Sequence, residues 1–95
     1  MNLQALHSKQ TEVSLVPLFK GEAGTVAAMQ LPANEILKKH ITKIPALLIC
    51  VTGKVLYYDI KGLEKTLSPG EYVHIEPMVE HWAEGVEDSN LLLIK

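Results

Sequence analysis

Short apolar segments and clusters of turn residues alternate along the whole chain. "KGEAG" (20–24), "LPANE" (31–35), "SPGE" (68–71) and "EGVEDSN" (84–90) are four such clusters, and the segments between them are rich in Val, Ile, Leu, Tyr and Thr. Regularly spaced short strands separated by turn signals are typical of an all-β sandwich or barrel. No segment after the first ten residues keeps a helical period. The predicted strands occupy residues 11–19, 25–31, 36–42, 46–52, 54–60, 63–67, 72–75, 81–84 and 91–95.

The segment "ALLICV" (46–51) is apolar at every position. Periodicity alone would also allow a buried helix, but the flanking Pro45 and Gly53 and the β-branched Ile49 and Val51 favour a strand. An antiparallel sheet usually exposes one of its faces to water. Because this strand is apolar on both faces, we expect another layer of the chain or a second subunit to cover its outer face. A homodimer is therefore predicted.

Composition narrows the classes of partner. The 95 residues carry a net charge of −2, and lysines supply all nine basic charges because the chain has no arginine. Arginine provides the planar fork that recognises phosphates and bases, so its absence argues against nucleic acid as a partner. The longest apolar run is too short to span a bilayer, so no membrane partner is expected. A single cysteine, Cys50, and a start without a secretory leader favour a reducing, cytoplasmic location.

The four histidines differ in their expected positions. His7 falls in an N-terminal tail, residues 1–10, for which both a strand arm and a helical turn remain open. Strand alternation puts His40 and Thr42 on the same face of their strand. The apolar residues of "YVHI" (72–75) should point inward, which leaves His74 outside. His81 follows the loop "EPMVE" and is the second candidate, with His40, for an internal site.

Residues 34 to 53 keep the spacing of a known motif. Asn34 is followed by five residues and His40, Thr42 comes two places later, Ala46 four further, and Gly53 after six more. This spacing resembles the first motif of the cupin superfamily, whose corresponding places hold glycine, two histidines, a glutamate and glycine. The match is good in spacing, but the second histidine and the glutamate are replaced.

The segment from Gly70 onward resembles the second cupin motif in the same way. His81 follows Gly70 at the expected distance of eleven residues. Pro77 lies one residue beyond the motif's proline place, Met78 sits near its second glycine, and Gly85 replaces its asparagine. Asparagine and glycine tolerate a positive φ, which supports turns at Asn34, Gly53 and Gly70.

The resemblance, to small single-domain cupins in particular, covers about residues 24–95. It implies an all-β fold: an antiparallel double-sheet jelly roll, or β-barrel, with a cavity between its sheets. We therefore predict that residues 1–95 form a single cupin-like domain, with an N-terminal arm at 1–10 and the motif-bearing barrel at 24–95.

In metal-binding cupins, three histidines and a glutamate hold a divalent ion inside the barrel. The resemblance therefore implies His40 and His81 as two ligands for a divalent metal such as Fe, Ni, Mn or Zn. Thr42 offers only a neutral hydroxyl, and Ala46 offers no ligand at all. Catalytic sites normally need three protein ligands and an open position. A third ligand could come from elsewhere, for example Gln30.

The other interpretation needs no metal. His40 and His81 would line a pocket, each with one ring nitrogen bonded to the backbone or to water. With Thr42 and Trp82 they would form a cavity that binds a small polar or aromatic ligand, and this is the function we favour. One alternative is a metal-dependent cupin enzyme of dioxygenase, isomerase or epimerase type. Another is a non-catalytic dimeric interaction module. Whether the protein is catalytic is left open by the sequence.

Overall fold

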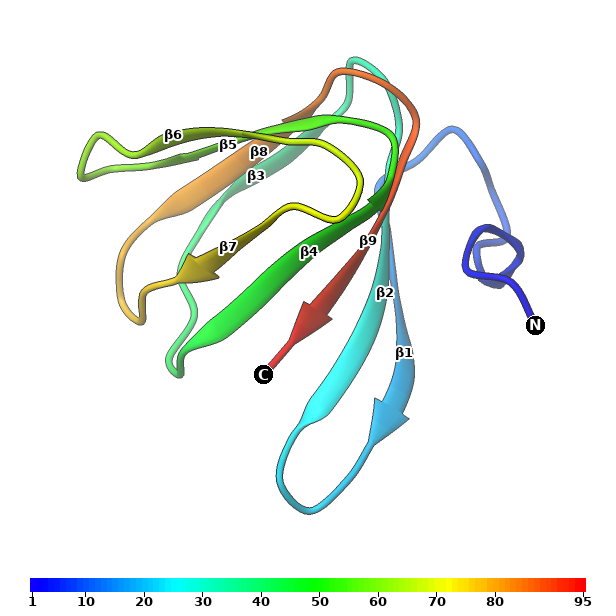
Figure 1. Ribbon diagram of the computed structural model, residues 1–95, viewed down its shortest axis with the longest axis horizontal. Coiled ribbons are helices and arrows are strands. Elements are labelled where there is room, and N and C mark those ends of the chain that lie inside the picture. The colour runs from blue at the N-terminus through cyan, green and yellow to red at the C-terminus, as the bar shows by residue number, and fades with distance from the viewer.

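Nine strands and one short helix make up the fold (Figure 1). The computed structural model describes residues 1–95. The elements are η1 (Gln4–Leu6), β1 (Ser14–Lys20), β2 (Thr25–Leu31), β3 (Ile36–His40), β4 (Ala46–Thr52), β5 (Val55–Asp59), β6 (Glu64–Leu67), β7 (Tyr72–Ile75), β8 (His81–Gly85) and β9 (Ser89–Ile94). All nine predicted strands are present, with shifts of a few residues at some ends. No helix has the length and apolar character needed to span a bilayer.

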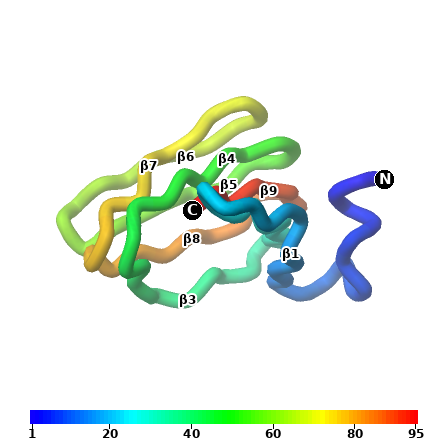
Figure 2. Tube along the Cα trace, turned by 90° about the horizontal axis from the view of Figure 1, so that it is seen from below, coloured from blue at the N-terminus to red at the C-terminus, as the bar shows by residue number.

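The strands form two antiparallel sheets, as the resemblance implied. The larger sheet has the order β1-β2-β9-β4-β7, and the smaller has the order β3-β8-β5-β6. In Figure 1 the two sheets converge toward the upper right, and the β1–β2 hairpin extends below the smaller sheet. Figure 2 views the same layers from below, with β3 and β8 on one side and β4 and β9 on the other. The chain thus folds as a double-sheet jelly roll.

Strand alternation decides which side chains enter the space between the sheets. On β4, Leu48 and Cys50 are fully buried, while Leu47 and Ile49 on the opposite face are only half-buried. On β7 the apolar residues point inward and His74 is exposed, as predicted. The "ALLICV" segment is therefore a strand whose inner face belongs to the core.

Several turns take a backbone conformation that most side chains avoid. Asn34 and Met78, at or near the glycine places of the two motifs, have φ values of 67° and 65°. Gly53 has a φ of 90°, and a Cβ at this position would collide with Ser89. The positive φ predicted for Asn34 and Gly53 is confirmed. At Met78 the surrounding loop imposes the same conformation on a residue that does not favour it.

The N-terminal arm forms the short helical turn η1 and packs against the larger sheet, so that His7, which was expected in this tail, is buried. His7 is only 4% exposed, and its Nδ1 shares a hydrogen bond of 2.7 Å with Ser14 Oγ. Gln30 on β2 is also buried, and its Nε2 donates to the carbonyl oxygens of Lys9 (2.6 Å) and Glu12 (2.8 Å). Gln30 therefore anchors the arm, and it is not available as the third metal ligand suggested from the sequence.

Candidate functional site

His40 and His81 come together between the two sheets. His40 is the last residue of β3 and His81 is the first residue of β8, and the two are direct partners in the antiparallel ladder. Directly opposed residues of such a ladder lie on the same face. Their ring centroids are 4.1 Å apart at an interplanar angle of 62°. We refer to these two side chains as the imidazole pair.

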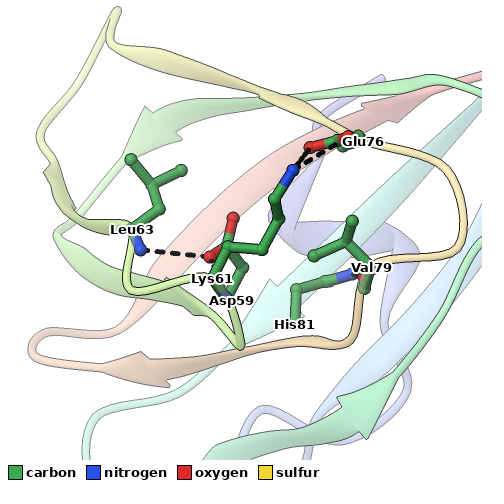
Figure 3. A network of polar contacts seen from close by, with 6 residues as sticks. All are labelled: Asp59, Lys61, Leu63, Glu76, Val79 and His81. Atoms are coloured by element: carbon green, nitrogen blue, oxygen red, sulfur yellow. Dashed lines mark hydrogen bonds and ion pairs between the residues drawn. The ribbon is translucent and has the colours of Figure 1, made fainter.

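The loop between β7 and β8 is tied to its surroundings just before His81. The backbone N–H of Met78 donates to the carbonyl oxygen of Thr42 at 2.8 Å, which joins this loop to the segment after β3. On the other side, Lys61 Nζ and Glu76 Oε2 form an ion pair of 3.1 Å (Figure 3). Both of those side chains are more than half exposed, so the pair adds little stability. It connects the loop between β7 and β8 to the turn between β5 and β6.

Backbone hydrogen bonds fix the orientation of both imidazole rings. His40 Nδ1 lies 2.7 Å from the carbonyl oxygen of Lys38, and His81 Nδ1 lies 3.1 Å from that of Val79. A carbonyl oxygen can only accept, so in each ring Nδ1 carries the proton and donates. In the neutral form, both Nε2 atoms therefore present lone pairs, and no protein group donates to either of them.

His81 is held in the neutral form by its surroundings. It is 2% exposed, and burial lowers its pKa below the usual value of 6.5. The hydrogen bond to Val79 acts against this shift, as does the Asp59 carboxylate, while the neighbouring His40 and the Lys95 ammonium act in the same direction as burial. At neutral pH the ring is therefore an acceptor at Nε2.

Thr42 supplies a polar group that the protein itself leaves unused. The residue is 6% exposed, and its Oγ1 is buried without a hydrogen-bond partner. A buried hydroxyl without a partner is costly, and most buried polar atoms in native proteins have one. Thr42 lines the cavity described next, and its hydroxyl is a polar group there that the protein leaves without a partner.

The imidazole pair and Thr42 share a mostly apolar cavity of about 180 Å³. Its remaining lining residues are Val13, Leu15, Met29, Leu37, Leu48, Tyr57, Ile75, Leu93 and Lys95. The Tyr57 ring stacks on His81 with centroids 5.7 Å apart, and burial with a smaller effect of Asp59 raises its pKa to about 12. The phenol thus stays protonated at neutral pH and serves as part of the wall.

Trp82 does not belong to this cavity, contrary to the sequence prediction. Since His81 points inward, its neighbour on β8 must point to the opposite face. The indole stacks on Tyr58 with centroids 5.5 Å apart, and Lys39 Nζ lies 4.7 Å from the indole centroid. The predicted cavity residues His40, Thr42 and His81 are thus brought together, and Trp82 is separated from them by the sheet.

The side chains present do not make a complete metal shell. No group of three or more His, Cys, Asp or Glu residues is arranged to hold a metal ion. Ala46, at the glutamate place of the first motif, is buried and carries no ligating atom. Two imidazoles and one neutral hydroxyl fall short of the three protein ligands that a resident catalytic metal requires.

Comparisons with solved structures support the fold. No protein-family model and no curated protein matches the sequence. A cupin superfamily protein from Desulfitobacterium hafniense superimposes with a TM-score of 0.84 at 12% identity, covering 98% of this chain and 84% of that chain. An RmlC-like cupin protein from Desulfovibrio desulfuricans gives 0.82 at 14% identity, with 98% and 90% covered. An RmlC-like cupin family protein from Methanocaldococcus jannaschii gives 0.78 at 17%, with 93% and 82% covered. The chain therefore has the fold of a small cupin.

Proposed function

We propose that this protein binds a small organic molecule in the cavity lined by the imidazole pair and Thr42. The observation that carries the proposal is the buried, unpartnered Oγ1 of Thr42 beside two Nε2 lone pairs that no protein group uses. The three residues line the same mostly apolar cavity, and a few polar groups in an apolar cavity are the usual arrangement of a specific small-molecule site.

The size and lining of the cavity support a ligand with an apolar body. An apolar cavity of about 150 Å³ is enough to admit a molecule of the size of benzene. The cavity here is slightly larger, at about 180 Å³, and aliphatic side chains form most of its wall. Burial of the ligand body against these side chains would supply affinity, and the few polar atoms would fix its orientation.

A metal-dependent enzyme is less well supported, because the donor set lacks a third protein ligand. We also propose that the protein is cytoplasmic. Its single cysteine, Cys50, is unpaired, as is usual in a reducing compartment.

A thermal-shift screen with a library of small metabolites tests the binding function. Binders should raise the melting temperature of the wild-type protein, since a ligand that binds only the folded state stabilises it by mass action. The shift should be lost in His40→Ala and in His81→Phe, which keeps a ring against Tyr57. His74→Ala, on an exposed outward-facing histidine, is the matched control and should keep the shift. A library that produces no shift would contradict the proposal.

A dimeric interaction module is the second candidate, and one observation favours it. On the outer face of the larger sheet, the ladder aligns Val16, Ala28, Leu92, Ile49 and Tyr72 in one row across all five strands. The adjacent row holds Phe19, Val26, Ile94, Leu47 and His74. Nine of these ten side chains are apolar or aromatic, and none is a Lys, Asp or Glu.

The N-terminal arm is anchored at one end of this outer face, where Gln30 donates to the carbonyl oxygens of Lys9 and Glu12. Phe19 and Tyr72 in these rows are more than half exposed, whereas Ala28 is buried between its neighbours. An apolar sheet face with exposed aromatic side chains is typical of an interface. A second copy of the chain is the partner we infer, since a two-fold axis would place two identical uncharged faces against each other. This interface leaves the cavity accessible, so dimerisation and ligand binding are compatible.

A further inference from the structure

The cavity lining contains a lysine and no acidic residue. Lys95 is the only lysine or acidic residue that lines the cavity, and Lys38 lies along the adjoining groove beside β3, while the Lys39 ammonium lies over Trp82 on the opposite face of the sheet. The whole chain has eleven acidic and nine basic residues, yet no Asp or Glu lines either hollow. A concave site lined by one sign of charge attracts ligands of the opposite sign.

The carboxylate of Asp59, which lies near His81, accepts hydrogen bonds from the backbone of the β5–β6 turn. Asp59 lies opposite His81 in the ladder, but its Oδ1 accepts from the backbone N–H groups of Lys61 (2.9 Å) and Leu63 (3.0 Å) in the β5–β6 turn (Figure 3). Lys95, in contrast, is placed beside the cavity by its backbone, which exchanges two hydrogen bonds with Thr25 on β2 (2.7 and 3.0 Å). Lys95 therefore supplies the lysine charge beside the cavity. The Asp59 carboxylate, which acts on the pKa values of His81 and Tyr57, is held in the turn by its two hydrogen bonds.

The imidazole pair would bind a hydrogen-bond donor of the ligand, whereas Lys95 would face an anionic group. Both Nδ1 protons are donated to backbone carbonyl groups, so in the neutral rings each Nε2 is an acceptor to which no protein group donates. A ligand hydroxyl can donate to such an acceptor. The Thr42 hydroxyl can itself donate to a ligand oxygen, because nothing in the protein accepts from it.

We propose that the cavity takes a small hydroxy acid with an apolar body. The hydroxyl of the ligand donates to the imidazole pair, and its carboxylate accepts from Thr42 and faces Lys95. The apolar body packs on the aliphatic wall formed by residues such as Leu48 and Leu93. This inference rests on the proposed binding function and adds the charge and the donor group of the ligand.

Isothermal titration with matched compounds tests each contact separately. The probes are 2-hydroxy-3-methylbutanoate and mandelate, each with its neutral amide and with the acid that lacks the hydroxyl. We expect each hydroxy acid to bind about tenfold more tightly than its amide and than its deoxy acid, as one charge-assisted or well-placed hydrogen bond provides. Lys95→Met should remove the preference for the acid over the amide. Lys65→Met, at an exposed lysine on β6, should leave it unchanged.

Failure of this inference can be told apart from failure of the binding function. If the amides bind as tightly as the acids, or if Lys95→Met keeps the preference, the anionic class is wrong while binding itself stands. Deoxy acids that bind as well as hydroxy acids would remove the hydroxyl from the proposal. If neither these probes nor any member of the metabolite library binds, both proposals fall.

Discussion

Replacing Thr42 by valine should make the protein more stable and less able to bind. Valine keeps the β-branched shape of threonine and removes only the hydroxyl. Thr42 is 6% exposed and its Oγ1 is buried without a partner, so the folded protein bears the desolvation cost of that group without a compensating hydrogen bond. Such a cost is about 1–3 kcal/mol. We therefore expect the free energy of unfolding to rise by at least about 1 kcal/mol, which corresponds to an increase of about 4–8 °C in melting temperature.

Urea unfolding followed by circular dichroism measures the change in stability, and titration with a hit from the metabolite screen measures the change in binding. Thr66→Val is the control, because Thr66 lies exposed on β6 and its change should stay within about 0.5 kcal/mol. Ligand affinity should fall about tenfold in Thr42→Val alone. A Thr42→Val protein that is destabilised by about 1 kcal/mol or more would refute the reasoning, because the hydroxyl would then have a partner in the free protein.

Four further outcomes are expected. Adding Fe, Ni, Mn or Zn should shift the melting temperature by less than about 1 °C, since His40 and His81 alone bind metal weakly; a large saturable shift would restore the metal-site hypothesis. Ile49→Glu should convert a homodimer into a monomer in light scattering, and a wild-type protein that is monomeric at micromolar concentration would contradict the interface. Burial lowers the pKa of His7, so the folded protein favours the neutral ring. The free energy of unfolding should therefore be unaffected by His7 above pH about 6.5 and should fall as the pH drops below that value. In His7→Leu this fall should be smaller. Burial raises the pKa of the Cys50 thiol, so the native protein should resist alkylation at pH 8 and react only in urea; rapid native labelling would show that the thiol is accessible.

The strands and their inward faces could be predicted because turn residues and alternation are local properties of the sequence. The resemblance to the two cupin motifs implied that His40 and His81 share an internal site, and the structure adds that the two residues are direct partners in the β3–β8 ladder. Asn34 has a φ of 67°, which agrees with the place that the spacing gave it. At this position the local turn needs a residue that tolerates a positive φ, and the first motif places such a residue there.

The prediction for Trp82 contradicted strand alternation, whereas the positions of Gln30 and Lys95 depend on contacts that the sequence does not show. Trp82 was predicted to line the cavity together with its neighbour His81, but adjacent residues of a strand point to opposite faces. Once His81 is inside, the indole must be outside. Gln30 and Lys95 depend on long-range pairing: the arm folds back on β2, and the end of β9 pairs with Thr25. No short-range pattern signals either contact.

A high-resolution crystal structure of the protein purified from cells without chelators would examine the cavity directly. We expect electron density for an organic molecule, with a donor atom about 2.8 Å from an Nε2 atom of the imidazole pair and an acceptor within hydrogen-bonding distance of Thr42 Oγ1. A metal ion coordinated by both histidines, or a collapsed cavity in which Thr42 and the two Nε2 atoms find partners within the protein, would contradict the proposed binding function.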